Sequence, residues 1–152
     1  MSDLQAPAFR LAVVALDGGP SDTRIIRLVA EVARHTKAQV VAVHVVEIDW
    51  TLPLDADIAG RSDEVQRVLD SAESVAEEFK VTLESVLLQA RDVGAALVDE
   101  ATERGADLLV VGLPYRQRFG GDFAIGRTIP YILQNAPCAV WVVRDPISEE
   151  SA

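Results

Sequence analysis

The chain has 152 residues, 49% of them hydrophobic, which is about the size of one domain with one sizeable core and leaves no room for a second. Its 14 Lys and Arg residues against 24 Asp and Glu residues give a net charge of −10, which repels phosphate backbones and anionic lipid headgroups. These properties argue against nucleic acids and membrane surfaces as partners.

The sequence also predicts no targeting signal, no disulfide and no metal site. No apolar run reaches the roughly 18 residues that a membrane span needs, and Met1 to Arg10 has neither the basic start nor the apolar core of a signal peptide. We therefore expect a cytoplasmic protein. The single cysteine, Cys138, excludes an internal disulfide, and with His35 and His44 as the only histidines we expect no metal site.

The first part of the chain predicts two strands with a helix between them. Phe9 to Leu16 and Gln39 to Val46 are short Val-rich runs, typical of buried parallel strands. In residues 22–37 hydrophobic side chains recur at helical spacing, with Ser21 as the candidate N-cap. This segment is therefore predicted to be an amphipathic helix.

The rest of the chain continues the same alternation. A second helix is predicted to begin near Ser62, because one apolar stripe runs through residues 65–79 with Asp and Glu on the other faces. Val81 to Leu88 then predicts a strand, and Asp92 caps a third helix that ends at Gly105. The remaining predicted elements are a strand at residues 107–111, a helix at about 127–135 and a final strand at 139–143.

Strands that alternate with helices in this way indicate an α/β fold: a five-stranded, doubly wound parallel sheet with helices on both faces. In such a sheet, ligands bind beyond the carboxyl ends of the strands, at the point where the strand order reverses. Two connections that start at such ends, residues 47–61 and 112–126, are longer than the usual few residues. We expect a ligand site near them.

The loop after the first strand, residues 17–21 (DGGPS), contains neither GxGxxG nor GxxxxGK[ST], the two standard nucleotide motifs. Asp17 allows two interpretations. An ionised carboxylate accepts a hydrogen bond from an adenine amino group or a ribose hydroxyl. Aspartate is also an ordinary turn or helix-cap residue, which composition alone favours.

The stretch from Gly112 to Thr128, GLPYRQRFGGDFAIGRT, is a glycine-containing loop that leads into the predicted fourth helix. Its glycines permit close backbone approach, and the free N–H groups and dipole of a helix N-terminus attract anions. Residues 112–127 hold three arginines against Asp122 alone, although the chain as a whole is acidic. The alternative is a solvated loop whose arginines pair with the acidic surface, and the residues alone leave both open.

The sequence offers no convincing catalytic group. Hydrolysis needs a base beside a nucleophile or a metal, and His44, the only mid-strand histidine, is of a kind that is more often structural. Asp55 and Asp57 lack a third metal ligand, and Trp50 in the same loop either covers a bound base or anchors the loop. We therefore expect no enzymatic activity.

Four segments together resemble the universal stress protein family, and the resemblance runs from Phe9 to Arg144. They are VVALDGGPSD, VAVHVVE, GADLLVVG and NAPCAVWVVR. The resemblance implies the adenine nucleotide alpha hydrolase-like fold over residues 9–145, between an N-terminal extension (1–8) and an acidic tail (146–152). It also implies a role in the stress response.

The resemblance further implies a site for ATP, AMP or a related anion at the sheet switch point. In the nucleotide-binding members an Asp after the first strand contacts the base, and G-2x-G-9x-G-[ST] after the fourth strand carries the ribose and phosphates. Asp17 matches the acidic residue, Val45 matches a position whose main chain meets adenine, and Gly112 and Gly126 match the outer glycines.

The middle and the end of this motif depart from the family pattern. Tyr115 stands at the second glycine, and the spacing from there to Gly126 is one residue too long. Arg127 replaces the Ser/Thr, with Thr128 one place later, and an arginine at a helix N-terminus still binds an anion. The expected ligand contacts are Asp17, Val45, Gly112, Gly126, Arg127 and Thr128.

Two functions therefore remain open. The first is a regulatory module that binds an adenine nucleotide or a related small anion. The second, which Tyr115 and Arg127 favour, is a family member that has lost nucleotide binding and acts only through protein–protein interaction. In either case the resemblance places the final strand, Cys138 to Arg144, at the sheet edge and implies a homodimer in which two such strands meet.

Overall fold

The computed structural model of the chain describes residues 8–53, 62–113 and 125–147. Strands and helices alternate along these residues, which confirms the predicted order of elements. The elements are β1 (Leu11–Leu16), α1 (Ser21–Ala33), β2 (Gln39–Glu47), α2 (Ser62–Phe79), β3 (Leu83–Ala90), α3 (Val93–Arg104), β4 (Leu108–Leu113), α4 (Thr128–Asn135) and β5 (Ala139–Arg144).

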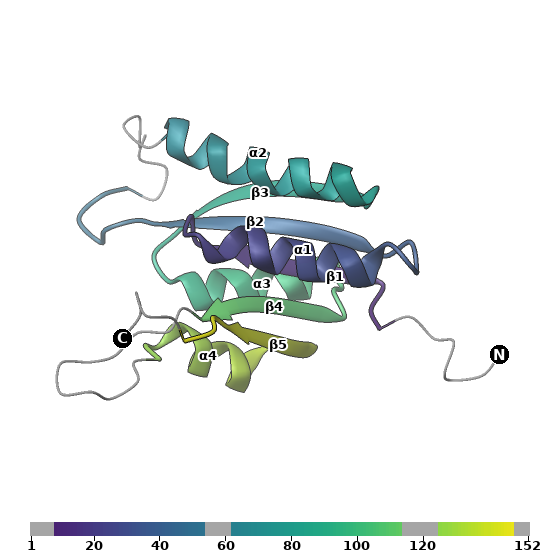
Figure 1. Ribbon diagram of the computed structural model, residues 1–152. Helices are drawn as coiled ribbons and strands as arrows, with labels where there is room; N and C mark the ends of the chain where they lie inside the picture. The colour runs from purple at the N-terminus through teal and green to yellow at the C-terminus, as the bar shows by residue number, and fades with distance from the viewer. Residues whose placement is uncertain (1–7, 54–61, 114–124, 148–152) are drawn as a thin grey trace.

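The strands form one parallel sheet in the order β3-β2-β1-β4-β5. Helices α1 and α2 pack together on one face of the sheet and α3 and α4 on the other (Figure 1). The predicted doubly wound parallel sheet is confirmed. Because the strand order reverses beside β1, the carboxyl ends of β1 and β4 border the switch point, where ligands bind in folds of this kind.

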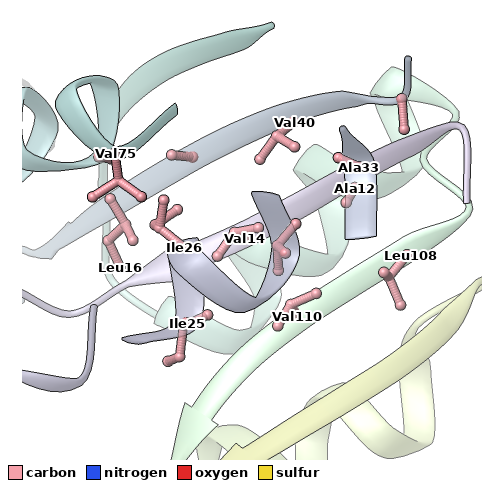
Figure 2. Close-up of a cluster of buried hydrophobic side chains, with 14 of the residues drawn as sticks. Ala12, Val14, Leu16, Ile25, Ile26, Ala33, Val40, Val75, Leu108 and Val110 are labelled. Carbon is pink, nitrogen blue, oxygen red and sulfur yellow. The ribbon is translucent and has the colours of Figure 1, made fainter. Parts of the chain in front are cut away.

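Alternate residues of the strands enter two separate cores. Ala12, Val14 and Leu16 of β1 point toward α1 and α2, where they pack among residues of both helices (Figure 2). Val13 between them points to the opposite face and packs against Leu97 of α3. Burial on both faces explains why the central strands read as nearly continuous apolar runs.

The start of α1 differs from its prediction. Pro20 occupies the N-cap position, and no side chain caps the helix there. Ser21, the candidate N-cap, is instead the first helical residue, and its hydroxyl donates a hydrogen bond of 2.5 Å to Oδ2 of Asp145, just after β5. The prediction was wrong because the partner of Ser21, Asp145, lies far away in the chain, where a local sequence pattern gives no sign of it.

The end of α1 falls earlier than the local sequence pattern suggests, whereas α2 ends at Phe79, where its apolar stripe ends. Helix α1 ends at Ala33 rather than near Lys37, because Lys37 has a φ of 58° and Ala38 N–H bonds back to the Ala33 carbonyl. Lys80 takes a similar left-handed conformation after α2, which delays β3 by two residues. At α1 the local periodicity continues past the turn, so it overestimates the length of this helix.

The predicted boundaries of α3 are confirmed. Asp92 is the N-cap, and its carboxylate accepts a hydrogen bond from Ala95 N–H at 3.0 Å. Gly105 ends the helix in the left-handed conformation, with a φ of 65°. Among the described helices, none is both long and apolar enough to cross a bilayer.

Candidate functional site

Two clefts lie at the carboxyl ends of the strands. The larger, about 780 Å³, lies between the loop after β1, the end of β2 and helix α2. The smaller, about 340 Å³, lies between the ends of β1 and β4 and the start of α4. Asp17 and Asp22 line both clefts, so the two meet at the β1–α1 loop.

The β1–α1 loop is held by its own two carboxylates. Oδ1 of Asp17 accepts a hydrogen bond from Gly19 N–H at 2.7 Å, so the turn role is one that Asp17 fills. Asp22 accepts hydrogen bonds from Asp17 N–H at 3.1 Å and from Gly18 N–H at 2.9 Å. These bonds leave Asp17 exposed at the junction of the clefts, with a second carboxylate oxygen that is able to accept from a ligand.

Partial burial raises the pKa of Asp22 to about 6. The neighbouring charge of Asp17 adds to this effect, whereas the backbone hydrogen bonds from Asp17 and Gly18 oppose it. Near neutral pH the junction therefore carries two adjacent carboxylates, which repel a bound anion.

The N-terminus of α1 is not free to bind an anion. Helix N-termini attract phosphates and carboxylates. Here Asp22 lies in the first turn of α1, and Asp145 accepts the hydroxyl hydrogen of Ser21. A phosphate at this end would face two carboxylates of the protein itself.

The N-terminus of α4 is different. Its first turn contains no acidic residue, and no side chain of the described residues caps it. The N–H groups of Thr128 and Ile129, like those of any first turn, have no partner within the helix. Gly126, with a φ of 78°, precedes it and lines the smaller cleft together with Thr128. Of the two helix starts near the switch point, α4 is the one suited to an anion.

The structure brings the predicted site residues to one edge of the sheet. Asp17 lines both clefts, Val45 lines the larger, and Gly112, Gly126 and Thr128 line the smaller. Arg127 lines neither. Its side chain is 86% exposed, and Nη2 lies 3.7 Å from Oε1 of Glu47, at the end of β2.

Part of the predicted glycine loop lies outside the described residues. This applies to the departure at Tyr115, to Arg116, Arg118, Gly120, Gly121 and Asp122, and equally to Asp55 and Asp57 after β2. In the part of the chain that the structure describes, no three His, Cys, Asp or Glu side chains gather closely enough to hold a metal ion.

The family model for the universal stress protein family matches residues 8–144. The chain belongs to the universal stress protein family. It is 28% identical over 140 residues to the sensor protein KdpD of Mycobacterium tuberculosis, covering 92% of this chain but only 15% of the sensor's length. It is 24% identical over 147 residues to universal stress protein MJ0531 of Methanocaldococcus jannaschii, covering 93% and 85% of the two chains.

Solved structures of universal stress proteins share the fold of this chain, which is the adenine nucleotide alpha hydrolase-like fold. A complex with cAMP aligns with a TM-score of 0.68 at 21% identity, over 90% of this chain and 98% of the other. The Archaeoglobus fulgidus protein with dAMP aligns with a TM-score of 0.68 at 19% identity, over 91% of this chain and 99% of the other. The Arabidopsis thaliana protein with AMP aligns with a TM-score of 0.67 at 18% identity, over 93% of this chain and 95% of the other.

In this universal stress protein, two residues that the sequence did not identify as site residues line the clefts. Asp22 lines both clefts, and the only sequence signal for it is an acidic residue in the first turn of a helix after a glycine turn. His44 lines the larger cleft, and its Nδ1 lies 2.9 Å from the carbonyl oxygen of Leu16.

Trp50 makes contacts of the anchoring kind, which is one of its two predicted roles. Its ring is 78% exposed and lies 5.0 Å below the guanidinium of Arg91. Arg91 also donates hydrogen bonds of 2.9 Å to the carbonyls of Asp49 and Leu52, on either side of Trp50. Trp50 lines neither cleft.

Proposed function

We propose that this universal stress protein is a non-catalytic regulatory module that binds an adenosine phosphate at the switch point of its sheet. The observation that carries the proposal is the contrast between the two helix starts at that point. The start of α1 already has the carboxylates of Asp22 and Asp145, whereas no side chain of the described residues caps the N–H groups at the start of α4, beside the smaller cleft. The cAMP, dAMP and AMP complexes of structurally similar family members support the same class of ligand.

The charges of the clefts suggest how the ligand is oriented. Among the described residues, the carboxylates of Asp17, Asp22, Glu47 and Glu64 line the larger cleft, and Arg67 is the one cation. This cleft suits an uncharged base that donates hydrogen bonds, and it disfavours a phosphate. We therefore propose that the base lies between β2 and α2 and the phosphate at the start of α4.

Isothermal titration calorimetry with AMP tests the proposal. Arg127→Ala removes the cation at the start of α4, and the loss of one charge-assisted contact costs about 1.5–3 kcal/mol of binding free energy. Arg34→Ala is the matched control, because it removes the same charge from the C-terminal end of α1, at the opposite end of the strands from the clefts. Wild-type protein that does not bind AMP, or equal weakening by both variants, would contradict the proposal.

The alternative function, protein–protein interaction without a nucleotide, is favoured by one contact. Arg127 is the residue that replaces the Ser/Thr of the family motif, and it already lies beside Glu47 across the end of β1. An incoming phosphate has to compete with this exposed pair, which is worth at most about 1 kcal/mol. The competition is weak, so we favour the nucleotide.

We also propose that the protein forms a homodimer through β5 and acts in the cytoplasm in a stress response. In the sheet order β5 is at an edge, where only β4 pairs with it. Large apolar side chains are exposed on β5 and on α4, which packs against it: Tyr131, Leu133 and Val142. An edge strand flanked by exposed apolar side chains favours association.

A further inference from the structure

His44 has one ring nitrogen committed to the fold. Its Nδ1 lies 2.9 Å from the carbonyl oxygen of Leu16, the residue that faces it in the β1–β2 ladder. A carbonyl oxygen only accepts hydrogen bonds, so Nδ1 must carry the proton. In a neutral imidazole the other nitrogen, Nε2, is then an acceptor.

The histidine ring lies at the wall of the larger cleft. Gly18, with a φ of 85°, packs over it, since a Cβ at this position would lie 3.8 Å from His44 Cε1 and 3.6 Å from Cγ2 of Val68. All three residues line the cleft. Among the described residues the hydrogen bond of the His44 ring is made through Nδ1, so Nε2 is open to a molecule bound in the cleft.

The other polar groups of this cleft are mainly acceptors as well. The carboxylates of Asp17, Asp22, Glu47 and Glu64 line it together with His44. A ligand that enters must therefore offer donors. Among purines, the exocyclic 6-amino group of adenine is a donor, whereas the 6-oxo group of hypoxanthine is an acceptor and would face His44 Nε2 with no hydrogen between them.

Resting on the proposed function, we infer that His44 is a specificity-determining residue whose Nε2 accepts a hydrogen bond from the 6-amino group of the bound base. It thereby selects adenine over 6-oxo purines. A site built to pair with a donor rejects an analogue that lacks it, because its own acceptor is then left unpaired.

Two variants separate this role from the structural one. His44→Asn keeps an N–H donor near the position of Nδ1, so the bond to Leu16 is preserved while the group at Nε2 is lost. His44→Gln does the reverse, because its longer side chain places an amide oxygen near the position of Nε2 but gives up the Leu16 contact. Thermal unfolding of each variant reports the structural role independently.

The experiment compares AMP with IMP by calorimetry at pH 8. We expect the wild type to prefer AMP by about tenfold or more, and His44→Asn to lose about 3- to 10-fold in AMP affinity without weakening IMP. His44→Gln should retain part of the preference even if it unfolds at a lower temperature.

The outcomes distinguish this inference from the proposed function. If the wild type binds AMP and IMP equally, or if His44→Asn keeps the full preference for AMP, the inference about His44 is wrong. The proposal that the protein binds a nucleotide then remains supported. If His44→Asn does not fold, loss of all preference in His44→Gln overturns the inference instead. If the wild type binds neither nucleotide, both proposals fail.

Discussion

Asp22 is a half-buried carboxylate at the junction of the two clefts, and its surroundings make it sensitive to pH. Burial and the neighbouring Asp17 raise its pKa from 3.8 to about 6. Between these values the folded state holds a proton that the unfolded chain has released. The free energy of unfolding therefore falls as the pH rises from about 4 to about 6, and the loss is complete above that range.

Comparison with Asp22→Asn isolates this effect. The difference in the free energy of unfolding, wild type minus Asp22→Asn, should decrease from pH 4 to pH 7, because only the wild type carries the titrating group. Urea denaturation at a series of pH values measures it. A constant difference would mean that folding leaves the pKa of Asp22 unchanged, and a difference that rises with pH would mean that folding lowers this pKa.

At the level of single residues, the sequence identified candidate side chains but not their burial or their hydrogen-bond partners. It proposed a turn role and a ligand role for Asp17, and the hydrogen bond to Gly19 shows the first without excluding the second. The sequence placed Asp22 only at the start of the predicted helix at residues 22–37, because its burial depends on how α1 meets the sheet. His44 was expected to be structural, and its bond to Leu16 is of that kind.

At the level of elements, the close packing of β4 against α1 depends on Gly112. A methyl group at this position would overlap Cδ1 of Ile25, which is buried in the core beneath α1 (Figure 2). Gly112 also lines the smaller cleft. A glycine that the family motif connects with the ligand thus also lies close to Ile25, whose terminal Cδ1 would have to move to admit a methyl group.

Replacement of Gly112 by Ala should lower the free energy of unfolding by about 1–3 kcal/mol, the usual cost of overpacking. In an Ile25→Val background the same replacement should cost much less, since valine lacks the Cδ1 atom that the new methyl group would overlap. Denaturant unfolding of the four proteins in this double-mutant cycle measures the coupling. Equal costs in both backgrounds would show that Ile25 is not the obstacle.

Elements were predictable where local pattern decides them. The cap of α3 at Asp92 and its stop at Gly105 follow from residue preferences, and both are confirmed. The end of α1 was placed about four residues late, because the hydrophobic spacing continues into the turn around Lys37. Ser21 was misassigned because its partner, Asp145, lies 124 residues away in the chain.

At the level of the whole molecule, alternation of element types was enough to predict the sheet and its switch point. That reasoning works because right-handed crossovers leave few topologies. The identity of the ligand is not contained in such rules. The ligand that we propose is inferred from residues at the ends of β1 and β2 and in α2 and α4, which meet only in the folded chain, and from how their charges are divided between two clefts.

The two edge strands of the sheet offer a matched test of the proposed homodimer. Val142 on β5 is 37% exposed and Leu87 on β3, at the opposite edge, is 45% exposed, so a lysine at either position still reaches solvent in the monomer. Val140 is a poorer choice because it packs against the core beneath α3 and α4.

We expect the wild type to be a dimer at about 50 µM and Val142→Lys to raise the dissociation constant by about tenfold or more, because dimerisation would bury an unpaired charge beside β5. Leu87→Lys adds the same charge to the other edge and should leave the dimer intact. Size-exclusion chromatography with light scattering measures both variants. A monomeric wild type, or dissociation caused by Leu87→Lys but not by Val142→Lys, would exclude β5 as the dimer interface.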